Sequence, residues 1–586
     1  MTLHDRVCIK TAVQGRPSEG VMRKKLVLMT AALLCLVLTV CILAACDENM
    51  PHSDIPSDAP REITTQDGFV LTLISETECE LDEYVGDSAN PIIPSEAEGR
   101  ELTSVRSGAF YGASIESVTI PDSVVSIGSG AFENCISLTS VAFGNGVRAI
   151  DDYAFHNSGL ESISVPDSVT VLGDSVFRDC GALRLAHIGK GVADIGERIF
   201  ANCPLLSIIS VDEENPVFHS DGECLIETES KVLRAGCSAS VIPSDGSVTS
   251  VAEGAFTACT FVSVALPDAV THIGDGAFAG CGELRSITIP RNVSHIGKGV
   301  FNRCGMLTSI SVAAENAAYQ SIGNCLVERT SKTLVAGCSA SVIPSDGSVT
   351  SIGEEAFFGH WALTSAVIPD SVTDIGASAF DGCSALRSLS IGRGVSNIGE
   401  SAFAGCSELT SVSVPSGVTS IKPFTFGDCV ALTSVELPDS VTRIEYSAFS
   451  GCKSLTAVNI PDGVTAIGEQ AFSGCSALTS VTIPYGVTVI ESMTFLGCES
   501  LASVVIPANV TEIGFGAFLG CQSLATLTIP DSVTVIAEFA LASCPKLTAV
   551  NYYGTTAQWN AIDKREYWSD ASPLEKVLCS DGTAAV

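Results

Sequence analysis

Short segments that alternate apolar and polar residues recur along most of the chain. Residues 478–484 read Leu-Thr-Ser-Val-Thr-Ile-Pro, so that Val481 and Ile483 fall on one side of an extended segment and Ser480 and Thr482 on the other. An alternation of period two predicts a strand with one buried face. The proline ends the strand, because it has no N–H to donate to a neighbouring strand.

Each predicted strand is followed by a turn and a second, shorter apolar stretch. After the strand that ends at Ile460, a Pro-Asp-Gly turn precedes Val464 and Ile467, and the segment Gly-Glu-Gln-Ala-Phe follows. We expect this last segment to form one helical or 3-10 turn. It would place Phe472 in the core, and Cys475 would close the unit.

The units recur at a fixed spacing. Seven successive phenylalanines lie 23 residues apart, each followed three residues later by a cysteine: Phe380, Phe403, Phe426, Phe449, Phe472, Phe495 and Phe518. A period of this length predicts a solenoid, in which every unit stacks on its neighbours to bury its apolar face. Sixteen Phe positions, with Leu541 as a seventeenth, predict about 17 coils of 23 residues. Strands about 4.8 Å apart would make a rod on the order of 80 Å long, with a parallel sheet along one face.

Two insertions interrupt the repeat. Phe200 to Phe256 and Phe301 to Phe357 each span 56 residues, and the two insertions match each other at an offset of 101 residues. A block of that size has therefore been duplicated. Each insertion contains two apolar stretches around a polar turn, which predicts a β-hairpin. We place these hairpins near 212–244 and 313–345.

Cysteines occupy two kinds of position. Fourteen of the seventeen positions that follow the core Phe or Leu541 by three residues are Cys. Their runs do not pair off evenly, so we interpret them as buried thiols that pack as small apolar groups, with a disulfide or metal ladder as the alternative. Other cysteines flank the hairpins, where either one disulfide per hairpin or two buried thiols would fit: Cys224 with Cys237, and Cys325 with Cys338.

The repeat motif, Leu-Thr-Ser-Val-x-Ile-Pro-Asp-Ser-Val-Thr-x-Ile-Gly-x-x-Ala-Phe-x-Gly-Cys, resembles the BspA-like leucine-rich repeats of bacterial and protozoan surface proteins. The resemblance covers residues 101–550, and residues 551–586 resemble the terminal segment of such proteins. It implies a right-handed, curved leucine-rich-repeat solenoid outside the cell, with an adhesive role in some members. Residues 67–100 lie outside the repeat, and we assign them as the N-terminal cap because exposed coil ends need covering.

The N-terminal residues have the features of an export signal. A basic segment precedes an apolar run from Leu26 to Leu43, and small residues lead to Cys46. Leu-Ala-Ala-Cys resembles the lipobox of bacterial lipoproteins, which implies that Cys46 is acylated and anchors the chain to the membrane. A plain transmembrane anchor is the alternative. We assign 1–46 as the signal, starting at Met1 or Met22, and the Pro-containing segment 47–66 as a flexible tether.

Charge and motif content narrow the function. Acidic residues outnumber basic ones by 66 to 31, and this balance argues against binding nucleic acid, whose phosphates require Lys and Arg. No Ser/His/Asp order, phosphate-binding loop or zinc motif is present, so we expect neither an enzyme nor a cofactor. His272 and His295 fall at the same position of adjacent coils, close enough to share a metal. Other coils carry varied polar residues there, which favours a solvated position.

The polar positions of the strands are the remaining candidates for binding. They should form an uncharged, hydroxyl-rich stripe, and we single out five of them: Ser390, Ser413, Glu436, Asn459 and Thr482. We therefore expect a monomeric surface protein that binds an extracellular protein or glycan through its solenoid and meets the membrane only through its lipid anchor. A structural surface protein without a dedicated ligand, or a carrier whose activity lies in the hairpins, are the alternatives.

Overall fold

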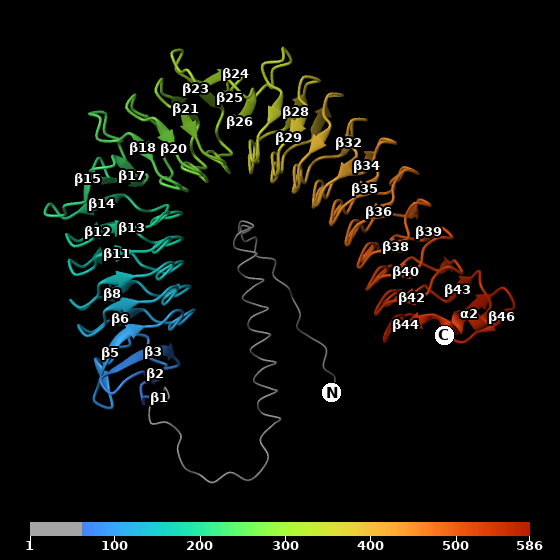
Figure 1. Ribbon diagram of the computed structural model, residues 1–586, viewed down its shortest axis with the longest axis horizontal. Coiled ribbons are helices and arrows are strands. Elements are labelled where there is room, and N and C mark those ends of the chain that lie inside the picture. Colours follow the sequence, from blue (N-terminus) through green and yellow to red (C-terminus); the bar gives the residue numbers. More distant parts are fainter. Residues whose placement is uncertain (1–60) are drawn as a thin grey trace, which may run out of the picture. The chain divides into compact units, whose positions relative to one another are not determined.

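The computed structural model describes residues 61–586, which form coils stacked in sequence order (Figure 1). The predicted signal, its lipidation site Cys46 and most of the predicted tether lie outside the described residues. Within 61–586, no helix is both long and apolar enough to cross a membrane.

Each coil contributes two strands to two separate parallel ladders. In one coil, β10 (Ser162–Val165) buries Ile163 and Val165 and exposes its two serines, as the alternation predicts. It pairs with β12 (Leu185–Ile188) with a register shift of 23 residues. The second apolar stretch of the same coil forms β11 (Val171–Leu172), which belongs to the other ladder. The solenoid is thus confirmed, but it has two ladders where one sheet was predicted.

The ladder of longer strands is interrupted at several places, whereas the two-residue strands form longer runs. Besides β10 and β12, the longer strands are β6 (Ser117–Thr119), β8 (Ser140–Ala142), β14 (Ile208–Val211), β19 (Ser263–Val264), β21 (Ser286–Ile289), β23 (Ser309–Val312), β28 (Ser365–Ile368), β30 (Ser388–Ile391), β32 (Ser411–Ser413), β34 (Ser434–Glu436), β37 (Ser480–Thr482), β39 (Ser503–Val505), β41 (Thr526–Ile529) and β43 (Ala549–Tyr552). Besides β11, the short strands are β7 (Ser126–Ile127), β9 (Ala149–Ile150), β13 (Asp194–Ile195), β18 (Ser250–Val251), β20 (His272–Ile273), β22 (His295–Ile296), β27 (Ser351–Ile352), β29 (Asp374–Ile375), β31 (Asn397–Ile398), β33 (Ser420–Ile421), β35 (Arg443–Ile444), β36 (Ala466–Ile467), β38 (Val489–Ile490), β40 (Glu512–Ile513), β42 (Val535–Ile536) and β44 (Asp563–Lys564).

The segment before the core phenylalanine forms no helix, so the predicted helical or 3-10 turn is wrong. Gln470 has φ of 58° and Gly474 has φ of 71°, and a right-handed helix cannot include such residues. Backbone N–H groups instead alternate between two partners. Ala471 bonds back to the carbonyl of Gly468 at 3.2 Å, whereas Phe472 bonds to Thr494 of the next coil at 3.0 Å. The turn segments around the core phenylalanines, here called the turn edge, therefore form a third set of hydrogen bonds between coils.

Stacked phenylalanine rings run through the core beside the turn edge. Phe449 and Phe472 are fully buried, and their ring centroids lie 5.5 Å apart with nearly parallel planes. The stack is broken at both insertions, where glycine takes the place of the ring. Gly236 packs against Phe256 and Gly337 against Phe357. The insertions thereby divide the core of residues 61–586 into three clusters.

Both predicted hairpins are confirmed, as β16 (Cys224–Glu227) with β17 (Val232–Ala235) and β25 (Cys325–Glu328) with β26 (Thr333–Ala336). Each hairpin has an additional antiparallel strand that the sequence did not predict, namely β15 (Phe218–Asp221) and β24 (Tyr319–Ile322). β17 and β26 then pair in parallel with the next short strands, β18 and β27. Each insertion is therefore built into the stack as a further rung.

Caps complete the stack at both ends. The N-terminal cap contains β1 (Arg61–Thr64), β2 (Phe69–Leu73), β3 (Glu78–Tyr84), β4 (Glu96–Ala97) and β5 (Arg100–Val105), so it begins at Arg61, within the predicted tether. The C-terminal cap contains α2 (Thr556–Ala561), β45 (Lys576–Cys579) and β46 (Gly582–Ala584). Thr555 and Gln558 form a capping box that starts α2. Because hairpins and caps add rungs, the solenoid has about 22 turns rather than 17.

Candidate functional site

The exposed side of the longer strands, here called the long-strand face, carries the five predicted binding residues. Ser390, Ser413, Glu436 and Thr482 lie in β30, β32, β34 and β37 with exposed side chains. Asn459 is also exposed, although its segment forms only an isolated bridge with the next coil. The alternation thus predicted the orientation of all five residues. Their role in binding stays a prediction.

A hollow of about 550 Å³ brings three of these residues together. Ser390, Ser413 and Glu436 line it, and Arg393 lies at its turn end. Ser413 pairs directly with Glu436 in the ladder, whereas β30 and β32 belong to different sheets. The hollow therefore opens where the longer strands separate. Asn459 and Thr482 do not line it.

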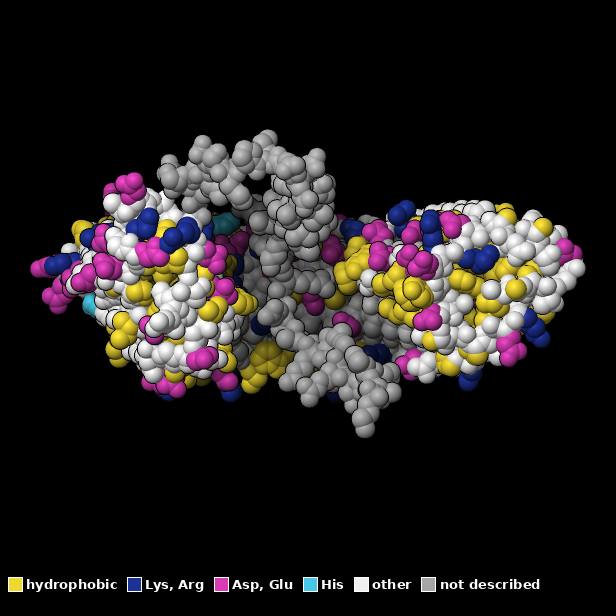
Figure 2. All heavy atoms as spheres, turned by 90° about the horizontal axis from the view of Figure 1, so that it is seen from below, with side chains coloured by type: hydrophobic (Ala, Val, Ile, Leu, Met, Phe, Trp, Pro, Cys, Tyr) yellow, Lys and Arg dark blue, Asp and Glu magenta, His cyan; other side chains and the backbone are white. Residues whose placement is uncertain are grey.

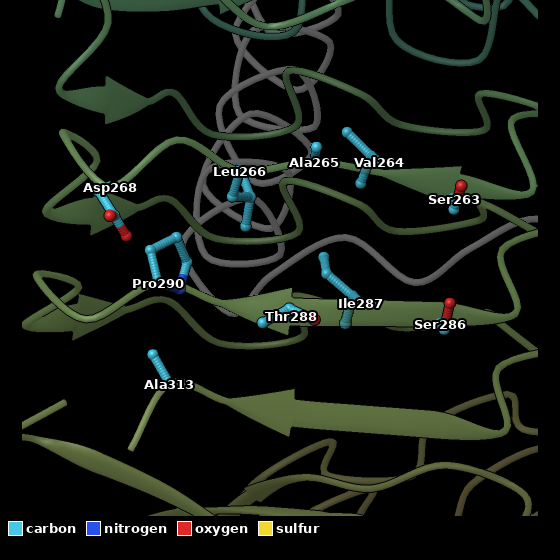
Figure 3. A pocket seen from close by; sticks show the side chains of 10 residues that line it. All are labelled: Ser263, Val264, Ala265, Leu266, Asp268, Ser286, Ile287, Thr288, Pro290 and Ala313. Carbon is cyan, nitrogen blue, oxygen red and sulfur yellow. The ribbon is translucent and has the colours of Figure 1, made fainter. Parts of the chain in front are cut away.

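A second hollow of about 330 Å³ lies at the same repeat positions of earlier coils (Figure 3). Ser263, Ser286 and Thr288 supply hydroxyl groups to it, and Asp268 lies at its turn end beside Pro290. β19 pairs with β21 only at its two residues, so this hollow also opens where strand pairing stops. The Thr288 hydroxyl lies 2.8 Å from that of Ser311 in the next coil.

The walls of the two hollows are largely polar. Both combine serine or threonine hydroxyls with exposed aliphatic carbons and one or two charges at the ends. Asp268 is paired with Arg291 of the following coil and accepts a hydrogen bond from it. Sequence reasoning missed Asp268 and Arg393, because both follow the strand-ending proline or glycine and were assigned to the turn. The periodicity gives no sign of where strand pairing stops.

Figure 2 shows acidic and basic side chains scattered among uncharged ones over the face that it presents. Within residues 61–586, no group of three or more His, Cys, Asp and Glu side chains is placed to hold a metal ion. His272 and His295 do lie one rung apart, as predicted, with ring centroids 5.9 Å from each other. Both side chains are exposed. These observations leave the long-strand face as the best-defined candidate site.

The hairpin cysteines are free thiols in this structure. Cys224 packs in the middle core cluster, whereas Cys237 packs in the N-terminal one. Cys325 and Cys338 are likewise divided between two clusters. Burial raises the pKa of the Cys224 and Cys325 thiols to about 12. A disulfide in each hairpin stays a prediction.

Three solved structures are similar: a leucine rich cell surface protein from Faecalibacterium prausnitzii A2-165 (23% identity, 87% of this chain and 99% of that one, TM-score 0.38), a leucine-rich repeat protein from Eubacterium ventriosum (21%, 71% and 95%, 0.36) and the pneumococcal vaccine antigen PcpA (15%, 88% and 99%, 0.25). No protein with a curated description matches the chain significantly.

A family model described as the BspA type leucine rich repeat region (6 copies) matches most of the chain, over residues 103–220, 235–334, 329–456 and 444–561. These matches cover the second hairpin and most of the regular coils, whereas residues 221–234, which hold most of the first hairpin, fall between two matches. They agree with the 23-residue motif and with the two parallel ladders of the structure. The chain therefore belongs to the BspA type leucine-rich-repeat family.

Proposed function

We propose that this chain is an exported surface protein that binds an extracellular protein or glycan on its long-strand face. One observation carries the proposal. Two hollows with hydroxyl-lined walls occur at equivalent repeat positions of that face, in coils 263–290 and 389–438. Solenoids present long surfaces of this kind, and binding is their usual mode of action. A row of hydroxyls with intervening aliphatic carbons suits the backbone of a peptide or the ring of a sugar.

Several features support a binding role over catalysis. The acidic groups that line the hollows are few, namely Asp268, which is paired with Arg291, and Glu436. The buried thiols hold their protons because burial raises their pKa values, so they do not supply a nucleophile. A solenoid without a dedicated ligand would carry the same core. The proposal therefore depends on the hydroxyl-lined hollows of the long-strand face and not on the core.

Capture by immobilised ligands tests the proposal. The purified chain is applied to arrays of extracellular matrix proteins and glycans, alongside a variant with Ser390→Ala, Ser413→Ala and Glu436→Gln. We expect the parent chain to be captured by a defined subset of ligands and the variant to lose at least tenfold in affinity, about 1.4 kcal/mol. Capture that is unchanged in the variant would place binding elsewhere. Absence of capture would favour the structural role.

Anchoring by lipid is part of the same proposal. The Leu-Ala-Ala-Cys sequence supports acylation of Cys46, and a lipid anchor would hold the solenoid at the outer surface. Growth of the expressing bacterium with a radiolabelled fatty acid should label the chain. Cys46→Ala should abolish the label and release the protein from the membrane fraction. Equal labelling of the two forms would overturn the anchor.

A further inference from the structure

The second copy of the duplicated block carries the chain's one exposed tryptophan. The sequence contains three tryptophans. Trp559 and Trp568 are buried in the C-terminal cap, whereas Trp361 is 42% exposed. Trp361 lies on the turn edge, directly after the position that cysteine occupies in most coils and His360 occupies here. It is therefore separate from the long-strand face and its hollows.

Two glycines of earlier coils form a shelf beneath the indole. A Cβ atom on Gly305 would lie 2.1 Å from Cε3 of Trp361, so only glycine leaves room for the ring. A Cβ atom on Gly282 would lie 3.6 Å from Cη2, in ordinary contact. The indole thus lies against the backbone of two successive coils. One side of the indole ring packs against this backbone, and the exposed area of Trp361 lies on the remainder of the ring.

Comparison of the two copies of the block shows that neither the repeat nor the hairpin requires this arrangement. At an offset of 101 residues, Trp361 corresponds to Thr260 and Gly305 corresponds to Pro204. The first copy thus lacks both the indole and the glycine that makes room for it. In the first copy, the hydroxyl and the backbone N–H of Thr260 both donate hydrogen bonds to the hydroxyl of Ser238. The tryptophan and its shelf are a paired feature of the second copy.

The positions next to Trp361 carry small hydroxyl side chains. Ser384 and Ser407 occupy the same position in the next two coils, and both are half-buried. The Ser407 hydroxyl donates to the backbone carbonyl of Ser384 at 3.2 Å. An aromatic hot spot for a protein partner is normally surrounded by a wider apolar area that excludes water. Trp361 instead lies between the glycine positions of the earlier coils and the serine positions of the later ones, and Met306, next to Gly305 in the sequence, adds one exposed apolar side chain.

We propose that Trp361 is a binding platform for the sugar ring of an oligosaccharide. One face of a pyranose presents C–H groups with slight positive charge, which are attracted to the negative face of an indole. The hydroxyls at the edge of the sugar need hydrogen-bonding partners, and Ser384 and Ser407 are the hydroxyl side chains at the same position of the next two coils. The fixed orientation of the indole reduces the ordering cost of binding.

Fluorescence of the full chain gives a direct test, because Trp361 is its one exposed indole. Cellohexaose, maltohexaose and the hexamer of N-acetylglucosamine are titrated separately. We expect at least one to shift the emission to shorter wavelength and to protect it from acrylamide quenching. Trp361→Thr, which installs the residue of the first copy, should lose at least tenfold in calorimetric affinity. Trp361→Phe should retain most of it.

A gain of binding in the first copy provides a second test that does not depend on the folding of the Trp361 variants. Pro204→Gly with Thr260→Trp should create a second platform and raise the number of sugar sites from one to two. The proposal is overturned if none of the three oligosaccharides affects the emission or if binding is unchanged in Trp361→Thr. It is also overturned if the double variant, folded and with its new indole exposed, still has a single site. Loss of capture on the long-strand face would leave these results unchanged, since the two surfaces are separate.

Discussion

The thiol of Cys475 donates a hydrogen bond to the backbone carbonyl of Phe449, in the preceding coil, at 3.2 Å. Cys452 makes the same bond to Phe426, and Cys498 to Phe472. These carbonyls lie in the core beside the stacked rings, where an unpaired polar group is costly. The repeated cysteine is therefore more than a small apolar side chain. It supplies a second donor to a buried carbonyl of the preceding coil, which also accepts a backbone N–H, as the Phe449 carbonyl does from Cys452 at 3.2 Å.

Replacement of Cys475 tests this role. Cys475→Ala leaves the Phe449 carbonyl with only the backbone N–H of Cys452 as a donor. We expect the loss of one hydrogen bond to lower the free energy of unfolding of the C-terminal block by about 0.5–1.5 kcal/mol. Cys475→Ser keeps a donor of similar size and should lose less, and serine already occupies this position as the buried Ser158. Urea denaturation followed by circular dichroism measures both. Equal losses for the two variants would contradict the role of the donor.

Alkaline pH should weaken the same coil. Burial raises the pKa of the Cys475 thiol from 9.0 to about 12. Between these values the folded chain keeps the proton and the unfolded chain releases it, so stability falls as pH rises from about 9 to about 12. Any stability advantage of the parent over Cys475→Ser should therefore shrink over this range. A difference that stays constant in urea midpoints across the range would rule this out.

His360 should make the second hairpin junction sensitive to acid. His360 occupies the position that cysteine has in most coils. Its Nδ1 atom has no hydrogen-bond partner, whereas the side chain forms a hydrogen bond with the backbone of Phe301. Burial lowers its pKa from 6.5 to about 4. Between these pH values His360 is protonated in the unfolded chain and neutral in the folded chain. The free energy of unfolding therefore falls by an amount on the order of 3 kcal/mol as pH falls from 6.5 to 4.

The matched control is His360→Cys, which restores the usual donor and removes the titration. Thermal unfolding of parent and variant is compared at pH 7 and pH 5. We expect the parent to lose more stability than the variant on acidification, because the other carboxylates are common to both. If both proteins lose the same amount, His360 is not the acid-sensitive group.

The glycine at each hairpin junction should be intolerant of substitution. A Cβ atom on Gly337 would lie 1.9 Å from the ring of Phe357, so Gly337→Ala must displace a buried aromatic side chain. Overpacking of this kind costs about 1–3 kcal/mol. Gly181→Ala is the control, since no atom lies within 4 Å of its Cβ position. The melting temperature should fall clearly for the first variant and little for the second. Similar melting temperatures for the two variants would mean that the hairpin junction can relax around the added methyl group.

Much of the fold could be predicted from local chemistry. Alternation with period two identified the buried and exposed sides of the longer strands, including Ser413 and Thr482. Two apolar stretches around a polar turn identified the hairpin strands β16 and β17. The strand β15 was missed because Phe-His-Ser-Asp does not alternate. The helical turn was wrong because a positive φ at residues such as Gln470 is not encoded by an obvious glycine.

The site could be predicted only in part. The exposure of Ser390 follows from its position in the strand, but the hollow beside it depends on β30 and β32 belonging to different sheets. Such an interruption arises from the spacing of whole coils, to which the insertions contribute, and not from the residues of one repeat. The hydrogen bond from the thiol of each cysteine to the preceding coil likewise depends on how whole coils stack. The spacing of 23 residues predicted burial, but not the partner.

Binding of the extracellular ligand on the long-strand face is the central claim. The most direct measurement compares the affinity of two matched lysine variants for a ligand captured by the parent chain. Ser413→Lys places a charged side chain in the larger hollow, and Thr442→Lys places one at an exposed position outside it. Surface plasmon resonance should show at least a tenfold loss for Ser413→Lys and parental affinity for Thr442→Lys. Parental affinity for Ser413→Lys, or an equal loss for both variants, would contradict the central claim.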